Sequence, residues 1–205
     1  MLEVLRHYEP LIRRSAVLRR LKLAPGGYFL VSAHREENVD DARNFRDLLN
    51  SLAAVSKRYG QKIVVSTHPR TRARLASVKR PRSKSGIEFL KPLGFPDYVK
   101  LQMNARCVLS DSGTLTEESS ILGFPAVMIR QAHERPEGMD EATVIMAGLK
   151  SDRILEAIDL VIAHRAARKR PFRMAADYAA DNVSQKVVRI ILSYTDYVNR
   201  TVWHK

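Results

Sequence analysis

Short apolar runs rich in β-prone residues alternate along the chain with longer segments whose apolar residues recur at helical spacing. Six runs predict strands: YFLVSA (28–33), KIVVST (62–67), GIEFL (86–90), RCVLSD (106–111), PAVMI (125–129) and TVIMA (143–147). Three segments predict helices between them: 44–60, 95–105 and 151–169. Strands that are nearly all apolar and separated by helices are typical of parallel sheets. The pattern therefore predicts an α/β fold, a Rossmann-like parallel sheet of about six strands with helices on both faces.

Two further helices, at residues 2–22 and 182–203, lie outside this alternation. The second carries apolar residues on a wide arc, so we expect it to pack on more than its own domain. With 205 residues and 45% apolar content, the chain fits one domain better than two. We divide it into an N-terminal helix (1–22), a Rossmann-like core (23–170) and a terminal segment with its helix (171–205).

The chain is strongly basic, with 35 Lys and Arg against 22 Asp and Glu and a formal charge of +13. The excess gathers at 70–84 and 164–173, which lack the interleaved aromatics of a single-strand nucleic-acid platform. We favour a solvated basic surface over specific nucleic-acid binding. No apolar run is long enough to span a membrane, and the first residues are acidic and polar where a signal peptide needs an apolar run, so we expect a cytoplasmic protein without membrane contact. The single cysteine, Cys107, sits in an apolar run and excludes an intramolecular disulfide.

Polar residues follow the predicted strands, where open α/β sheets bind their ligands. The first strand is followed by His34, Arg35, two glutamates and Asn38. The imidazole there could act as an acid or base beside carboxylates, or the segment could be only a loop capped by Asn38 or Asp40. After the second strand come His68, Pro69 and Arg70, which form a second and weaker candidate anion contact. Pro69 should start the helix that follows.

The segment Ser110–Glu118 predicts a strand, a glycine turn and a helix, an arrangement that suits phosphate. Asp111 or Ser112 could cap the helix, and Gly113 would let an anion approach the backbone. Glu117 and Glu118 should point about 100° apart, so that one at most turns inward.

The loop after the fifth strand, residues 130–138, is unusually polar for a connection between buried strands. Such loops at strand ends often bind ligands. An arginine in it could grip a diphosphate in a forked geometry.

Four motifs in order, SAHREENVD, STHPRT, DSGTLTEESSILGFPAVMIR and HERPEGMDEATV, resemble the C-terminal lobe of the non-hydrolysing UDP-N-acetylglucosamine 2-epimerases. The resemblance runs along nearly the whole chain. DSGT in place of DSGG, with the loop IRQAHERPEGMDE, is most similar to the branch that converts UDP-N-acetyl-L-pneumosamine to UDP-N-acetyl-L-fucosamine for surface polysaccharides.

This resemblance implies two Rossmann-like lobes of the glycosyltransferase-B type, with the nucleotide-sugar in the cleft between them. The reaction it implies inverts C2 of the sugar by eliminating UDP to a 2-acetamidoglycal and adding it back. No metal, NAD or other cofactor is implied. By motif position, His34 matches the family's active-site histidine, Arg135 its diphosphate arginine, and Ser112, Gly113 and Thr114 its phosphate-holding turn.

The remaining correspondences concern the nucleoside and a second site. Glu118 matches the ribose-binding carboxylate, and Tyr98 falls where the family has an aromatic near the uracil. Arg35 and His68 resemble contacts of a regulatory nucleotide-sugar site found in some members. Leu93 stands where others have a glutamine, which leaves only backbone to read that edge of the base.

The partners expected from the resemblance are UDP, a UDP-N-acetyl-hexosamine and an N-terminal lobe that carries the other catalytic carboxylates. We expect this chain to be inactive without that lobe and its terminal helix to lack a partner, which leaves a homodimer open. Three alternatives remain: a stand-alone UDP-binding module without catalysis, the donor lobe of a glycosyltransferase, and a basic nucleic-acid binder.

Overall fold

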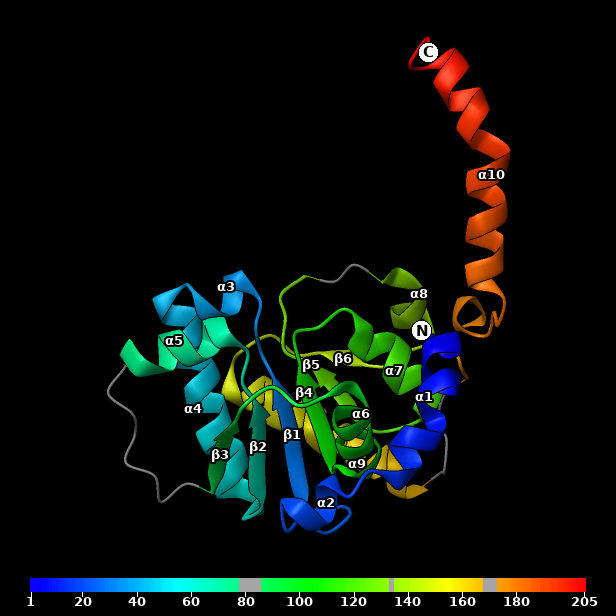
Figure 1. Ribbon diagram of the computed structural model, residues 1–205. Coiled ribbons are helices and arrows are strands. Elements are labelled where there is room, and N and C mark those ends of the chain that lie inside the picture. The colour runs from blue at the N-terminus through cyan, green and yellow to red at the C-terminus, as the bar shows by residue number, and fades with distance from the viewer. Residues whose placement is uncertain (78–85, 133–134, 168–172) are drawn as a thin grey trace.

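The computed structural model describes residues 1–77, 86–132, 135–167 and 173–205, and its centre is one parallel sheet (Figure 1). The strand order is β3-β2-β1-β4-β5-β6, and every pairing is parallel. The bounds are β1 Tyr28–Ser32, β2 Lys62–Ser66, β3 Ile87–Leu90, β4 Cys107–Ser110, β5 Ala126–Met128 and β6 Ile145–Met146. The predicted α/β fold class is therefore confirmed, with each predicted strand in place.

The strand order places a topological switch point between β1 and β4. From β1 the chain passes to β2 and β3 on one side, and then crosses back to β4, β5 and β6 on the other. Ser32 pairs with Ser110 in the register of β1 and β4, so the two strands end side by side. Open parallel sheets bind their ligands at such a point, beyond the carboxyl ends of the strands.

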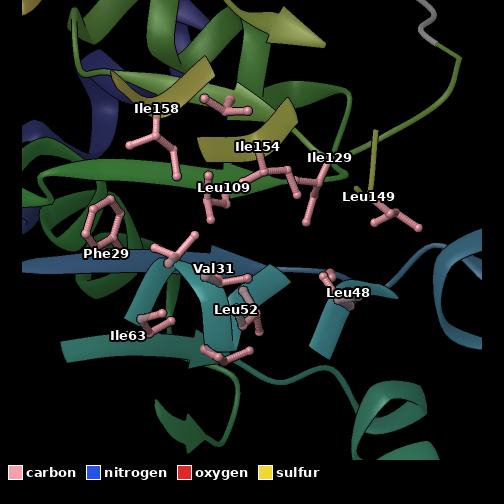
Figure 2. Packing of buried hydrophobic residues seen from close by; sticks show 14 of the residues in the cluster. Phe29, Val31, Leu48, Leu52, Ile63, Leu109, Ile129, Leu149, Ile154 and Ile158 are labelled. Carbon is pink, nitrogen blue, oxygen red and sulfur yellow. The ribbon is translucent and has the colours of Figure 1, made fainter. Parts of the chain in front are cut away.

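One face of the sheet is covered by α4 (Ala42–Tyr59) and α9 (Ser151–Ala167). Their apolar residues, among them Leu48, Leu52, Ile154 and Ile158, pack on strand residues such as Phe29 (Figure 2). Helix α4 is capped by the Asp41 side chain, which accepts from the backbone N–H groups of Arg43 and Asn44. The predicted alternatives Asn38 and Asp40 are therefore not its cap, and they lie in or next to the short helix α3 (Glu36–Val39).

The opposite face is covered by α6 (Phe95–Asn104) and α7 (Thr114–Leu122). Leu101 of α6 and Leu115 of α7 join Leu30, Val64 and Val108 of the strands in a second buried cluster. These two helices also carry Tyr98 and Glu118, so the packing of this face determines how the two side chains approach the strand ends.

The predicted N-terminal helix at 2–22 is wrong as one element, because the chain forms α1 (Leu2–Arg14) and α2 (Val17–Arg20). Ser15 leaves the helix with ψ 127°. Its hydroxyl donates to Asp97 at 2.5 Å and accepts from the Val17 N–H at 3.2 Å. A serine that bonds in this way competes with helix continuation, and the break lets Val17 be fully buried.

The terminal helix α10 (Val183–Thr201) projects away from the rest of the molecule (Figure 1). None of its residues is buried. The exposed large apolar side chains of this helix and the residues after it are Val183, Val187, Val188, Ile190, Ile191, Leu192, Tyr194, Tyr197, Val202 and Trp203. Helix α10 therefore buries no side chain on the rest of the described chain, as expected of a helix that lacks its partner, and it meets its own domain at Ser184, which donates to Glu3.

No helix within the described ranges is long and apolar enough to cross a membrane. Cys107 is a free, fully buried thiol whose pKa is raised by burial, which agrees with its place in an apolar run.

Candidate functional site

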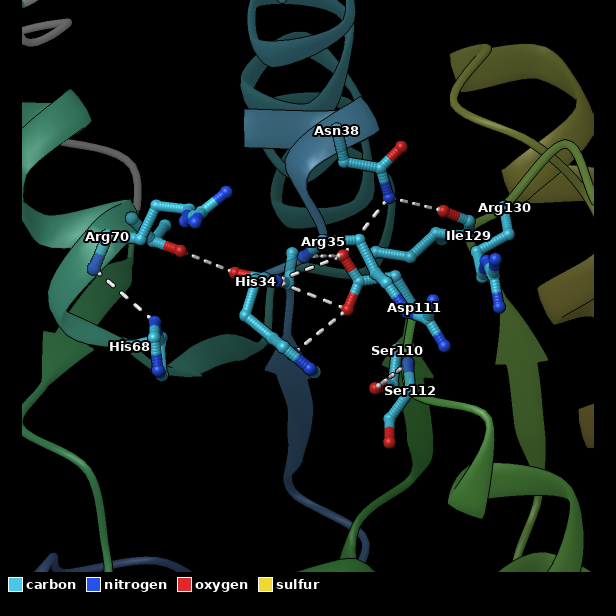
Figure 3. A network of polar contacts seen from close by, with 12 residues as sticks. His34, Arg35, Asn38, His68, Arg70, Ser110, Asp111, Ser112, Ile129 and Arg130 are labelled. Atoms are coloured by element: carbon cyan, nitrogen blue, oxygen red, sulfur yellow. Dashed lines mark hydrogen bonds and ion pairs between the residues drawn. The ribbon is translucent and has the colours of Figure 1, made fainter. Parts of the chain in front are cut away.

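Asp111 lies at the centre of the polar residues that gather where β1 and β4 end (Figure 3). Its side chain is completely buried. The Oδ2 atom accepts from the backbone N–H groups of His34 and Arg35, both at 2.9 Å, and from the Asn38 amide at 3.1 Å. The Oδ1 atom lies 3.1 Å from Nδ1 of His34. One carboxylate therefore fixes both the backbone turn and the imidazole.

Asp111 stays ionised in this buried position because of its partners. Burial alone would raise its pKa, but the His34 side chain and the N–H groups of Arg35 and His34 lower the pKa below the ordinary value. With Nδ1 held by Asp111, Nε2 of His34 is the ring nitrogen that can meet another group. The His34 side chain is 37% exposed, which leaves room for that contact.

The structure corrects the expected surroundings of His34. The carboxylate beside the imidazole comes from Asp111 on the neighbouring strand end, whereas Glu37 pairs with Arg130 at 3.2 Å and Glu36 with Arg70 at 2.7 Å. The predicted helix-capping role of Asp111 is also wrong, because its carboxylate is turned back to the loop after β1.

His68 lies close to His34, with ring centroids 5.8 Å apart. Pro69 begins α5 (Pro69–Ser77), as predicted. Arg70 does not reach into the site as a free anion contact, because its guanidinium lies between Glu36 and Asp40, at 2.7 and 3.0 Å. The Arg35 N–H donates to Asp111 beside that of His34. Arg35 and His68, which the resemblance relates to a regulatory site, therefore both lie at the loop that carries His34.

The turn before α7 is built from short polar side chains. The hydroxyls of Ser112 and Thr114 are 2.9 Å apart, and the Ser112 N–H donates to Ser110 Oγ at 3.1 Å. The N-cap residue is Gly113, and no side chain caps the helix. Ser112 is therefore not the predicted cap, since its hydroxyl is directed at Thr114. An uncapped helix start of this kind favours an anion through its N–H groups and dipole.

Glu118 turns towards Gln102 of α6, whereas Glu117, whose side chain is 14% exposed, pairs with Arg135; the helical geometry predicted that the two point in different directions. Its side chain is buried, and Oε2 accepts from Nε2 of Gln102 at 2.6 Å. Burial raises the pKa of Glu118, while hydrogen bonds from Gln102 and Thr114 act in the opposite direction. Sequence reasoning missed Gln102. Its position one helical turn after Tyr98 is the signal that could have found it.

Tyr98 lies on the same face of α6 and reaches the end of β1. A hydrogen bond joins its side chain to Ser32, and burial followed by the negative charge of Glu118 raises its pKa. Its hydroxyl is thus directed at the strand end, beside the groups assigned to the nucleotide.

Arg135 precedes α8 (Pro136–Asp140) and lies 2.9 Å from Glu117. About a third of its side chain is exposed, so the guanidinium can also meet a ligand. Helix α8 is held from two sides: Gly138 packs directly on Thr116 of α7, and the Tyr178 hydroxyl donates to Glu137 at 2.8 Å. The preceding residues 133 and 134 of the predicted loop lie outside the described residues.

The close approach of Gly138 to α7 gives a first prediction. A Cβ at this position would overlap the Thr116 Cγ2 methyl, so Gly138→Ala should displace α8 and lower the free energy of unfolding by about 1–3 kcal/mol. Denaturant unfolding measures the change. The double variant Gly138→Ala/Thr116→Ser, which removes the overlapping methyl, should recover most of the loss; a stable single variant would contradict the packing argument.

No group of three or more His, Cys, Asp or Glu side chains that could hold a metal ion is found among the described residues. The polar groups at the strand ends are an imidazole, guanidinium groups, hydroxyls and the carboxylates of Asp111 and Glu118.

The fold and the strand-end site define an α/β domain of the Rossmann type, with its polar groups gathered at the switch point of the sheet. A sequence model of the UDP-N-acetylglucosamine 2-epimerase family matches residues 1–192, and the chain belongs to this family. A curated relative, UDP-N-acetylglucosamine 2-epimerase of Methanocaldococcus jannaschii, is 30% identical over 173 residues, which cover 83% of this chain and 45% of the relative.

Solved structures agree with the family assignment. The UDP-N-acetylglucosamine 2-epimerase of Rickettsia bellii is 48% identical with a TM-score of 0.86, covering 99% of this chain and 54% of its own. The M. jannaschii UDP-GlcNAc 2-epimerase, solved in complex with UDP-GlcNAc and UDP, is 26% identical with a TM-score of 0.78, covering 90% of this chain and 50% of its own. This chain thus spans about half the length of the relatives it matches.

Proposed function

We propose that this chain is the C-terminal, UDP-binding lobe of a two-lobed UDP-N-acetyl-hexosamine 2-epimerase. The observation that carries the proposal is the His34–Asp111 pair, which adjoins the uncapped start of α7 at the switch point of the sheet. Family membership and the half-length match to relatives support it. So does the relative solved with UDP-GlcNAc and UDP, nucleotides of the kind this site would take.

In the proposed reaction, a base removes the C2 proton as the C1–O bond to the β-phosphate breaks, giving UDP and a 2-acetamidoglycal. A proton then returns to C2 from the other face, and the UDP oxygen adds back to C1. The carboxylates for the C2 proton would come from the N-terminal lobe. His34, held by Asp111, would use Nε2 to stabilise the departing phosphate oxygen or to relay a proton to it.

The other residues would hold the nucleotide. The turn of Ser112, Gly113 and Thr114 would offer N–H and hydroxyl donors to the phosphates, and Arg135 would clamp the diphosphate. Glu118 would accept the ribose hydroxyls. Tyr98 would lie near the base, with its hydroxyl fixed at the end of β1.

We further propose that the sugar belongs to the L-pneumosamine and L-fucosamine branch, for surface polysaccharide synthesis. The support comes from two sequence motifs: DSGT, which contains Thr114, and the loop that leads to Arg135. The Thr114 hydroxyl bonds to Ser112 at 2.9 Å, a contact that a glycine could not make. Arg35 and His68, which adjoin the His34 loop, remain the candidates for a regulatory nucleotide-sugar site.

The exposed apolar face of α10 would pack on the N-terminal lobe. In this arrangement the core binds the nucleotide and the terminal helix joins the other lobe. The contact with that lobe would cover the large apolar side chains that α10 exposes. A helix that buries nothing on its own domain needs such a partner to be stable in water.

The test is calorimetric UDP titration and an epimerase assay, with and without the N-terminal half. We expect the chain alone to bind UDP weakly and to interconvert no UDP-sugar, and the joined halves to be active. Turnover by the chain alone would overturn the lobe assignment. UDP binding without turnover in the joined protein would favour a stand-alone module, and salt-sensitive binding that ignores UDP would favour a nucleic-acid binder.

Arg135→Ala should weaken UDP binding to the two-lobed protein by about 2–4 kcal/mol, because the diphosphate would lose its charged, forked partner. Calorimetry on the variant measures the loss. Arg153→Ala is the matched control, since Arg153 is exposed on α9 and pairs only locally with Glu156. Equal affinities for the two variants would remove Arg135 from the site.

A further inference from the structure

Glu118 is approached by two side chains of α6, one helical turn apart. Gln102 donates from Nε2 to Glu118 Oε2 at 2.6 Å, and Tyr98 is close enough for the Glu118 charge to raise its pKa. Gln102 lies on α6 and Glu118 on α7, so their bond joins the two helices that cover this face of the sheet. The bond holds Oε2 of the carboxylate from the α6 side, and a hydrogen bond from Thr114 reaches Glu118 from its own helix.

The two polar atoms of the Gln102 amide differ in their partners: Nε2 donates to Glu118 and Oε1 has no partner among the described residues. Gln102 is 1% exposed, and its Oε1 atom is buried. A buried acceptor left unpaired costs free energy. A leucine would fill similar space without that cost, so the benefit of the amide lies in the hydrogen bond that it donates to Glu118.

We infer that Gln102 is a positioning residue for ribose recognition: it fixes Glu118 through one oxygen so that the carboxylate can accept both hydroxyls of a nucleoside diphosphate. The inference rests on the proposed function, in which Glu118 meets the ribose. A carboxylate that is oriented and kept ionised accepts from two hydroxyls at once, whereas a rotated or protonated group loses at least one of these bonds. Gln102 would thereby determine the preference for ribose over deoxyribose.

The test compares UDP with 2′,3′-dideoxy-UDP by NMR titration of this chain. Gln102→Leu should weaken UDP binding about tenfold, the effect of one lost hydrogen bond to a charged group, and should leave binding of the dideoxy nucleotide nearly unchanged. The control Met103→Ala, on the exposed side of the same helix, should change neither. Equal losses for both nucleotides would mean a merely structural role, and unchanged UDP binding would also overturn the inference.

Gln102→Glu gives an independent readout if the leucine variant folds poorly. The introduced carboxyl group would take the place of the Gln102 amide, which lies 2.6 Å from Glu118. Two carboxyl groups this close cannot both ionise readily, so they should share a proton whose pKa is raised. Below that pKa the introduced carboxyl group can donate to Glu118 as the amide does, and above it the donor is lost. UDP affinity of this variant should therefore fall as pH rises while the wild type stays level; parallel pH profiles would overturn the inference.

Glu118→Gln separates this inference from the proposed function. If this variant keeps the wild-type preference for UDP over the dideoxy nucleotide, Glu118 does not read the ribose and the proposed role fails. If Glu118→Gln loses the preference but Gln102→Leu keeps it, the proposed role stands and only the inference about Gln102 fails. A wild-type chain that does not bind UDP overturns both.

Discussion

Replacing His34 with alanine in the two-lobed protein should lower kcat by about 10²–10⁴-fold, the contribution of a positioned acid or base. UDP affinity should change little, because the diphosphate keeps Arg135 and the turn before α7. Steady-state kinetics and calorimetry on the same preparation measure the two effects separately. His7→Ala, on the exposed side of α1, is the control.

The opposite pattern would change the assignment of His34. If the alanine variant keeps a near-wild-type kcat but loses UDP affinity, His34 is a binding residue. The hydrogen bond from Nδ1 to Asp111 would then serve to orient a phosphate contact rather than a group that acts in the reaction.

Asp111→Ala should destabilise the domain by about 3–5 kcal/mol, because it leaves buried donors from the loop after β1 without their acceptor. The N–H groups of His34 and Arg35 and the Asn38 amide all donate to this carboxylate, and the Asn38 amide also donates to the Ile129 carbonyl oxygen. Urea unfolding followed by circular dichroism measures the loss. A variant as stable as the wild type would show that the loop finds other partners.

Asp111 should also make stability depend on pH. Its folded pKa is lowered, so the stabilisation is present above the unfolded pKa of about 3.9 and is lost as pH falls through the folded pKa. The stability gap between the wild type and Asp111→Asn should therefore narrow below about pH 4. A gap that stays constant down to pH 2 would mean that the carboxylate's charge contributes little.

Much of the fold follows from local sequence, because apolar runs and helical periodicity determine which segments can be buried. Even the shortest strand, Ile145–Met146, lies inside its predicted run 143–147. The break at Ser15 could not be predicted in this way, since it depends on a hydrogen bond to Asp97, 82 residues away.

The candidate site shows the same division between local and distant signals. His34 and the Ser112–Thr114 turn are visible because they directly follow predicted strands, and Arg135 because it lies in an unusually polar loop between two of them. Asp111 was predicted as a helix cap because the sequence shows only its neighbours along the chain. It does not show that the loop after β1 lies beside Asp111 in the fold. Gln102 was missed because its role requires knowing that α6 packs beside α7.

The contacts of Asp111 have a consequence for how the domain folds. Its partners His34, Arg35 and Asn38 lie 77, 76 and 73 residues earlier in the chain. Contacts of such wide sequence separation form slowly, because the chain between them must first be ordered. Here that chain includes β2, β3 and the crossover to β4, so the loop of His34 can reach its final shape only after β4 has paired with β1. We therefore expect His34 to be placed late in folding, and substitutions in β4 that slow its pairing should delay recovery of nucleotide binding more than recovery of helical signal.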